Sequence, residues 1–237
     1  AAPQRTYGTL AGAMLFTLSF MAKRSDNNML ILGVIPILFL VFFIELYRKK
    51  ENPFTNIAFT ILGIIYVALP FALWTLVIVP IDEAIILPVS FPAAYVTKIS
   101  AYHWELLLGF FILMWTSDSM AYVCGRLFGR HKLFERVSPK KTWEGAIGGG
   151  LFALGAAWLI SIWFKDIALV HWLVISGIVV ICGNLGDLTE SLFKRSINIK
   201  DSGTILPGHG GILDRFDAAL LASPFVATYL LIIPAPY

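Results

Sequence analysis

Acidic and basic side chains gather in one short stretch near the C-terminal end of the sequence. The acidic residues there are Asp187, Glu190, Asp201, Asp214 and Asp217, and the basic ones are Lys194, Arg195, Lys200, His209 and Arg215. If the preceding helix continues past residue 186, the polar residues from Asp187 to Lys194 recur at i, i+3, i+4 and i+7 and share one face. Asp214 and Asp217 are likewise three residues apart. Clustered carboxylate oxygens of this kind suit a hard divalent cation such as Mg²⁺.

A glycine-rich segment, Pro207-Gly208-His209-Gly210-Gly211, follows these acids and leads into the last hydrophobic segment. Its bare backbone N–H groups are suited to hold phosphate at a helix N-terminus. Acids for a metal, bases for phosphate and an exposed amide loop together indicate phosphoryl or nucleotidyl transfer.

Structural ion pairs are the alternative explanation for these charges, for instance a pair between Asp214 and Arg195. The same alternative applies to Glu190 and to Asp118, an acid inside an otherwise apolar segment. Carboxylates in a membrane are costly, and those that occur there either function or find a partner.

The elements that hold these residues follow from the composition. The chain has 237 residues, of which 58% are hydrophobic and 14% are charged, and its mean hydropathy is +0.78. Because so few charges cannot cover a water-exposed surface, the composition excludes an ordinary cytosolic enzyme, a secreted disulfide scaffold and a disordered tail. The net charge of +3 gives no indication of nucleic-acid binding. Cys124 and Cys182 are predicted to be buried single residues.

Seven segments are long and apolar enough to cross a bilayer as helices. They cover residues 6–22, 27–44, 52–81, 106–125, 145–164, 167–186 and 218–237. Residues 84–97 are shorter and interrupted by Pro88 and Pro92, which predicts a loop or interfacial segment. We therefore predict an all-α, polytopic integral membrane protein forming a single transmembrane domain over 1–237, with N-terminal helices in 1–103 and catalytic helices and loops in 104–237. Gly148-Gly149-Gly150 is expected to let a neighbouring helix approach closely.

The lysines and arginines set the predicted orientation. With seven spans, 14 of the 18 cations fall on one side, which the positive-inside rule places in the cytoplasm. Two long polar loops, 125–143 and 187–213, lie on that side. Anchoring to the membrane surface is an alternative explanation for Arg126, Arg130 and Lys132.

The same residues resemble the signature of a known family. The run Ser191-Leu-Phe-Lys194-Arg195, four residues, Lys200-Asp201-Ser-Gly203, and then Leu206 to Asp217 resembles the phosphatidate cytidylyltransferase (CDP-diacylglycerol synthase) family, without a departure over 27 consecutive residues. Two more segments are similar to the family, Ser138-Pro-Lys-Lys-Thr-Trp-Glu-Gly145 and Gly186-Asp-Leu-Thr-Glu-Ser191. The resemblance covers residues 115–221, and family members usually have further helices ahead of this region.

The resemblance implies a reaction and its partners. CTP and phosphatidate give CDP-diacylglycerol and diphosphate with Mg²⁺, in an integral membrane enzyme that tends to be a homodimer with a polar cleft open to the cytoplasm. It implies a bacterial inner-membrane protein and leaves open whether a second cation takes part. The family's metal ligands correspond to Asp187 and Asp214, with Asp217 close by.

The remaining roles follow from that reaction. Catalytic roles are expected for Asp187, Asp214, Lys194 and Arg195, the last two stabilising diphosphate or holding the lipid phosphate together with Lys200. Lys140 and Lys141 are expected to bind the triphosphate, and Ser138 or Thr142 to cap the next helix and contact phosphate. Substrate contacts are also expected for Ser191, His209, Gly210, Gly211 and Arg215. No general base is needed, because the attacking phosphate is already ionised. The other histidines, His103, His131 and His171, are expected at the surface or the membrane interface.

Three rivals predict other features. A transporter predicts charges near span centres and a repeated half, and the sequence shows neither. The CDP-alcohol phosphotransferase class predicts a closely spaced run of four Asp, which is missing. A relative of the same superfamily acting on an archaeal or polyprenyl phosphate, or a lipid kinase, remains an alternative.

Overall fold

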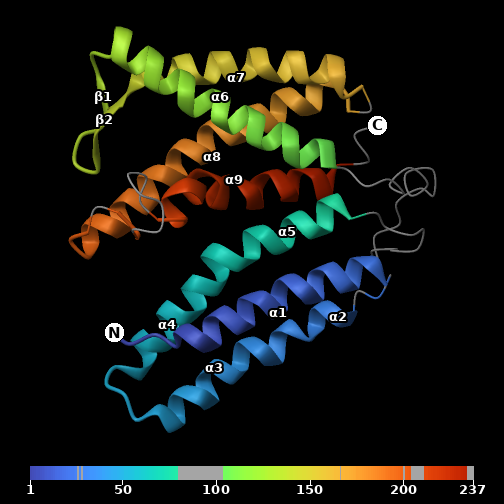
Figure 1. Cartoon of the computed structure of the whole chain (residues 1–237), viewed down its shortest axis with the longest axis vertical. Coiled ribbons are helices and arrows are strands. Elements are labelled where there is room, and N and C mark those ends of the chain that lie inside the picture. Colours follow the sequence, from blue (N-terminus) through green and yellow to red (C-terminus); the bar gives the residue numbers. More distant parts are fainter. Residues whose placement is uncertain are drawn as a thin grey trace. The chain divides into compact units, whose positions relative to one another are not determined.

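The computed structural model describes residues 1–25, 27, 29–79, 104–165, 167–199, 201–203 and 211–233. The chain divides into two compact units, Ala1–His103 and Trp104–Tyr237, which are drawn in Figure 1. The predicted interfacial segment 84–97 lies outside the described residues. Whether the two units act as one domain stays a prediction.

The N-terminal unit is a small helical bundle. Its helices are α1 (Arg5–Arg24), α2 (Met29–Leu32), α3 (Val34–Arg48), α4 (Pro53–Gly63), a π-helical turn η1 (Ile64–Ala68) and α5 (Leu69–Ile78). Pro53 begins α4, a position that needs no N–H donor. The π turn ends just before Pro70, whose missing N–H would otherwise interrupt a regular helix. The helix from α4 to α5 is therefore continuous over Pro53–Ile78.

Apolar contacts and one buried polar network hold this unit together. Ala11, Leu15, Ile64 and Ala72 form the apolar core. Glu45 is almost fully buried and accepts hydrogen bonds from Gln4 (2.8 Å), Arg48 (2.7 Å) and Asn56 (2.7 Å). Because a buried carboxylate is costly unless it is paired, this network ties the starts of α1 and α4 to the end of α3.

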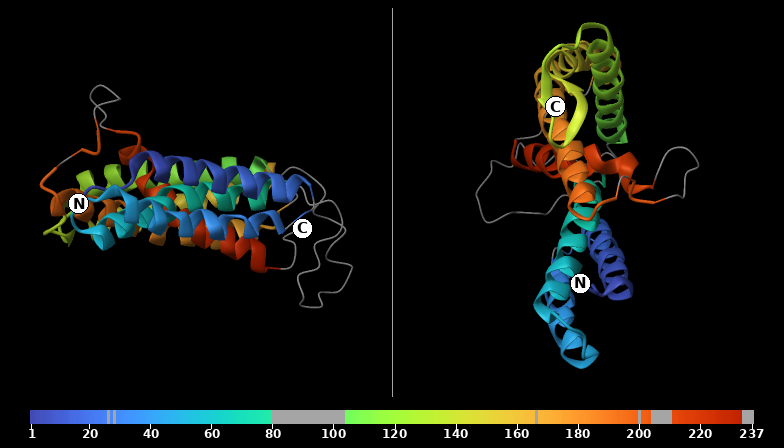
Figure 2. Two further views of the ribbon diagram at one scale, coloured as in Figure 1. Left: turned by 90° about the horizontal axis from the view of Figure 1, so that it is seen from below. Right: turned by 90° about the vertical axis from the view of Figure 1, so that its left-hand side faces the viewer.

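The C-terminal unit carries the predicted site. It consists of α6 (Trp104–Phe128), the strands β1 (Lys132–Phe134) and β2 (Ser138–Thr142), α7 (Trp143–Trp163), α8 (Leu169–Ser196) and α9 (Leu213–Ile232). The strands form an antiparallel hairpin in which Lys132 pairs with Thr142 and Phe134 with Ser138. The second view of Figure 2 shows this hairpin beside the helices. The sequence predicts only a loop at 125–143, whereas the other described elements are helices, as predicted.

Small residues allow α6 and α7 to pack closely. A Cβ added at Gly149 would lie 2.5 Å from the carbonyl oxygen of Ser117, and one at Gly145 would lie 2.7 Å from that of Ala121. On the same helix, a Cβ at Gly150 would meet Val180 of α8 at 3.3 Å. The predicted role of the glycine triplet in helix approach is therefore confirmed, since a side chain at Gly149 would collide with the backbone of α6.

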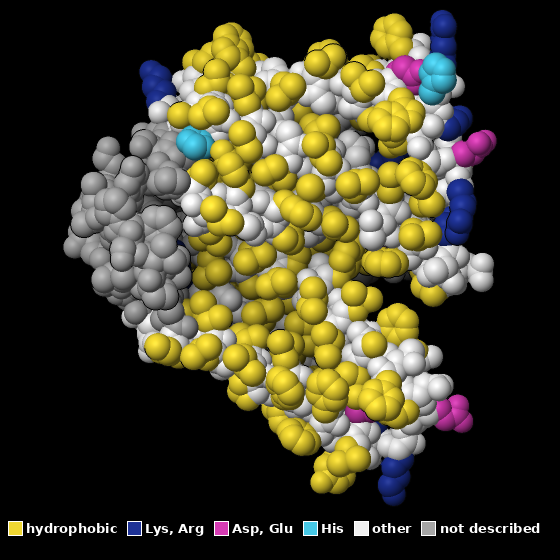
Figure 3. All heavy atoms as spheres, turned by 180° about the vertical axis from the view of Figure 1, so that it is seen from behind, with side chains coloured by type: hydrophobic (Ala, Val, Ile, Leu, Met, Phe, Trp, Pro, Cys, Tyr) yellow, Lys and Arg dark blue, Asp and Glu magenta, His cyan; other side chains and the backbone are white. Residues whose placement is uncertain are grey.

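Six helices among the described residues are long and apolar enough to cross a membrane. They cover Met29–Arg48, Pro53–Ile78, Trp104–Phe128, Trp143–Trp163, Leu169–Ser196 and Leu213–Ile232. The first predicted span also forms a helix, α1, which is less apolar and is not among the six. Figure 3 shows hydrophobic side chains spread over the surface of the protein. Phe43 and Leu151, for example, are 61% and 65% exposed. Such surfaces fit lipid as the solvent, and the chain is an integral membrane protein.

Candidate active site

The polar stripe predicted on α8 exists because the helix continues to Ser196. At 28 residues, α8 is about 42 Å long, longer than the ~30 Å hydrocarbon core. Its last turns can therefore extend past the hydrocarbon. Along the stripe, the Ser191 hydroxyl donates to Asp187 Oδ1 at 3.3 Å, and Lys194 forms an ion pair with Glu190.

Asp214, in the first turn of α9, joins α8 to the loop that precedes α9. Its Oδ1 accepts from Lys194 Nζ at 2.7 Å. Its Oδ2 accepts from the Ser202 N–H and hydroxyl, both at 2.8 Å, and from the Gly211 N–H at 2.7 Å. The expected alternative of a pair with Arg195 is wrong, because the cation at Asp214 is Lys194. Arg195 instead points to the carbonyl of Ile199 at 3.5 Å.

Lys194 lies between two carboxylates, those of Glu190 and Asp214. The Glu190 side chain is 1% exposed and that of Lys194 16%. A buried carboxylate of this kind requires a partner, and Lys194 supplies it for both acids. The arrangement fixes the end of α8 against the start of α9.

The β1–β2 hairpin reaches α8 through one lysine. Lys141 Nζ lies 2.5 Å from Asp187 Oδ2 and 3.4 Å from Asn184 Oδ1. Next in the chain, Thr142 Oγ1 caps α7 by accepting from the Gly145 N–H at 3.2 Å, as expected for either Ser138 or Thr142. Lys140, by contrast, is exposed. The hairpin therefore presents one lysine to the acids of α8 and the other to solvent.

Two further carboxylates lie near Asp187. Asp217 of α9 interacts electrostatically with Asp187, Glu190 and Asp118. Asp118 of α6 interacts with Lys141 and Asp187. Gly186 makes room for this approach, since a Cβ there would lie 2.9 Å from the carbonyl oxygen of Asp217. Acids from three helices are thus brought into one region by close backbone packing.

The donor set at this place fits a divalent cation. Three carboxylates, Asp118, Asp187 and Asp217, interact electrostatically with one another, and the Lys141 ammonium group interacts with two of them, Asp118 and Asp187. This excess of negative oxygen ligands is the environment that hard cations prefer. Within the described part of the chain, no three His, Cys, Asp or Glu side chains already form a metal-ligand group.

The remaining predicted site residues divide into two sets. Gly211 is in place beside Asp214, and a Cβ there would lie 2.8 Å from the Gly203 N. Arg215 lies in the first turn of α9. Lys200, His209 and Gly210 lie outside the described residues.

Two site contacts were not predicted. Ser202 donates twice to Asp214, and Asn184 meets Lys141 one turn before Asp187. Ser202 lies in the segment Lys200–Gly203, which resembles the family signature, so that resemblance could have identified Ser202 as a site residue. Asn184 lies three residues before Asp187 on the same helix, so the polar stripe begins one turn earlier than expected.

Sequence comparisons agree with this picture. The family whose model matches residues 2–233 is described as the Cytidylyltransferase family. A "Phosphatidate cytidylyltransferase" of Staphylococcus saprophyticus is 35% identical over 222 residues, covering 93% of this chain and 76% of that protein. A protein of the same name from Staphylococcus aureus is 34% identical over 201 residues, covering 84% and 68%. One from Haemophilus influenzae is 48% identical over 130 residues, covering 52% and 45%.

Proposed function

The chain belongs to the cytidylyltransferase family, and on that premise we propose how it transfers the cytidylyl group of CTP to phosphatidate. The products are CDP-diacylglycerol and diphosphate. The observation that supports this mechanism is the ion pair between Lys141 and Asp187, which brings an ammonium group to a cluster of carboxylates. Phosphate-binding and metal-binding groups are needed side by side when two anionic substrates react.

The chemical step is an in-line displacement. A phosphate oxygen of phosphatidate forms a bond to the α-phosphorus of CTP, and the bond from that phosphorus to the β-phosphate oxygen breaks, releasing diphosphate. The nucleophile is already ionised, so no residue has to remove a proton. The protein's task is to hold two anions in line and to offset their repulsion.

Lysine and arginine side chains perform that task. Lys141 and Lys140 on β2 bind the triphosphate, with Ser138 and Thr142 near its path. Arg195 and Lys200 receive the departing diphosphate or the lipid phosphate. Ser191 and the segment His209, Gly210, Gly211 and Arg215 supply further phosphate contacts.

Lys194 has a different geometry, because it is held between Glu190 and Asp214. In this arrangement it keeps Asp214 in place and contributes positive charge next to the reacting phosphates. Its low exposure supports this positioning role over a direct, freely moving contact with diphosphate.

A Mg²⁺ ion would be held by Asp187 and Asp217, which interact with each other, together with Asp214, the ligand that the family resemblance implies. Among the described residues, Asp214 Oδ1 accepts a hydrogen bond from Lys194, and an ionised carboxylate oxygen can accept or ligate through a second lone pair. When bound, the cation screens the charge of the two phosphates and polarises the phosphorus under attack. The same carboxylates have enough oxygen atoms to bind a second cation as well.

The active site faces the cytoplasm, and the protein acts as a homodimer. The concentration of Lys and Arg on the side that holds the polar loops supports that orientation, and a cytoplasmic site has direct access to CTP. The dimer rests on the family resemblance alone.

Substrate selection provides the test. Purified protein in detergent micelles is given phosphatidate or a polyprenyl phosphate, each with CTP or ATP. Turnover with the phosphatidate–CTP pair alone is the expected result. Use of ATP would indicate a lipid kinase, and preference for the polyprenyl phosphate would assign the site to another branch of the superfamily.

A further inference from the structure

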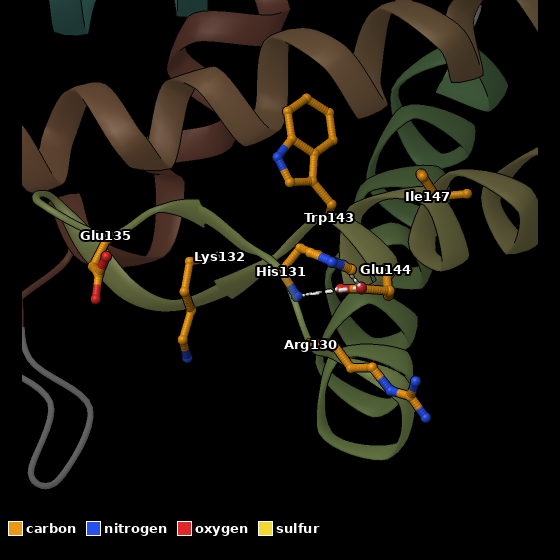
Figure 4. A pocket seen from close by; sticks show the side chains of 7 residues that line it. All are labelled: Arg130, His131, Lys132, Glu135, Trp143, Glu144 and Ile147. Carbon is orange, nitrogen blue, oxygen red and sulfur yellow. Dashed lines mark hydrogen bonds and ion pairs between the residues drawn. The ribbon is translucent and has the colours of Figure 1, made fainter.

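The first turn of α7 carries an acidic residue that holds the start of the β1–β2 hairpin. Glu144 accepts from the ring Nδ1 of His131 at 2.6 Å, and the His131 backbone N–H is 3.2 Å from both carboxylate oxygens. In return, the His131 carbonyl accepts from the Trp143 N–H at 3.0 Å. Figure 4 shows the two side chains turned toward each other. Because a carboxylate only accepts hydrogen bonds, the His131 Nδ1 must carry the proton.

The same contact forms part of an open cavity of about 790 Å³, which is lined by residues 130–132 at the start of β1, by Glu135 and by the first turns of α7. Lys132 and Arg130 also line it, and in Figure 4 neither side chain points toward Glu144. The Glu144 carboxylate is therefore paired with the His131 side chain and not with the side chains of Lys132 and Arg130, although the Arg130 backbone also contacts it.

The hairpin needs such a tie. A two-stranded hairpin alone is marginally stable in water, and most of this one is exposed, including Phe134 at 56%. His131 immediately precedes β1, and β1 pairs along β2, which carries Lys140 and Lys141. A restraint on His131 is therefore transmitted through the strand pairing to the two lysines.

We propose that Glu144 is a positioning residue for CTP, which acts through His131 to hold β2 and its lysines in the orientation that binds triphosphate. The proposal rests on the proposed function, in which Lys140 and Lys141 bind the triphosphate of CTP. An exposed ion pair by itself contributes little. Here the carboxylate also orients a backbone N–H at the entry to the hairpin, so its loss affects the order of the whole strand pair.

The test combines kinetics with hydrogen exchange in detergent or nanodiscs. In Glu144→Ala the KM for CTP rises roughly tenfold, the size expected for one charge-assisted hydrogen bond, while kcat and the KM for phosphatidate change little. Glu144→Gln keeps an acceptor for the His131 N–H and recovers part of the loss. Amides of residues 132–142 exchange faster in Glu144→Ala than in the wild type.

A double-mutant cycle identifies the partner. Combining Glu144→Ala with His131→Ala raises the KM for CTP no further than Glu144→Ala alone, because both changes remove one interaction. Glu135→Gln, which removes a carboxylate from the exposed part of the same hairpin, is the matched control and leaves both constants unchanged.

An unchanged KM for CTP in Glu144→Ala, equal losses for both substrates, or multiplicative effects in the double variant would overturn the proposal. A wild-type protein that forms no CDP-diacylglycerol would instead overturn the proposed function. The exchange measurement still reports on the Glu144–His131 contact in that case.

Discussion

Lys141 and Asp187 form an ion pair of 2.5 Å between β2 and α8. One is expected to bind a nucleotide phosphate and the other a cation, yet in the free protein each is the partner of the other. The pair keeps a lysine on an exposed hairpin directed at the acidic cluster. We expect a phosphate that arrives with its cation to replace both partners at once.

The two lysines of β2 are expected to differ in effect. Lys141→Ala lowers kcat/KM for CTP about a hundredfold, because it removes a cation that reaches the acids, a loss of about 2.7 kcal/mol of transition-state stabilisation. Lys140→Ala, at an exposed position, mainly raises the KM for CTP. Steady-state kinetics with each substrate varied separates the two. A change confined to phosphatidate would assign these lysines to the lipid.

Asp214→Asn is expected to reduce turnover by about a thousandfold, since it removes a charge that stabilises the cation and the reacting phosphates. The amide oxygen of Asn can still accept from Ser202 and Gly211, so the protein remains folded and membrane-inserted. Thermal unfolding and gel filtration in detergent provide the control. Near-normal turnover would remove Asp214 from the metal site.

Lys194→Met is expected to lower stability as well as activity. It leaves Glu190, 1% exposed, without its cation, and breaking a buried pair costs about 3–5 kcal/mol. Adding Glu190→Gln removes the stranded charge and restores part of the thermal stability. If Lys194→Met unfolds at the wild-type temperature, Lys194 does not hold the two acids together.

Gly149→Val is expected to destabilise the packing of α6 and α7. Overpacking typically costs about 1–3 kcal/mol, and here the added atoms meet the Ser117 backbone. Gly155→Ala on the same helix is the control, because a Cβ there meets nothing within 4 Å. The comparison uses thermal unfolding of each variant in the same detergent, and equal unfolding temperatures would mean that the helices are not limited by this contact.

The periodic parts of the protein could be predicted from the sequence. The length of the apolar segments located the membrane helices. The spacing from Asp187 to Lys194 predicted one polar face on α8, because helical geometry fixes which residues share a face. Gly148–Gly150 predicted close helix approach, because glycines have no side chain to keep a neighbouring helix away.

Contacts between distant segments could not be predicted in this way. The β1–β2 hairpin was missed because Pro139 and two lysines are unusual in a strand. Lys194 was predicted to bind phosphate, because sequence spacing does not reveal that its ammonium group donates a hydrogen bond to Asp214, twenty residues away. The sequence left open whether Asp118 is functional or forms a structural ion pair, since only the fold brings α6 next to Asp187 and Asp217.

The most direct measurement follows the α-phosphorus of CTP. Purified protein is incubated with phosphatidate, a divalent cation and CTP labelled at the α-phosphate, and the lipid and water-soluble products are separated. We expect the label to enter the lipid in an amount equal to the diphosphate released, and chelation of the cation to stop both. Two results would contradict this mechanism. One is CTP that remains intact. The other is label that stays in a water-soluble nucleotide while the unlabelled γ-phosphate of CTP enters the lipid.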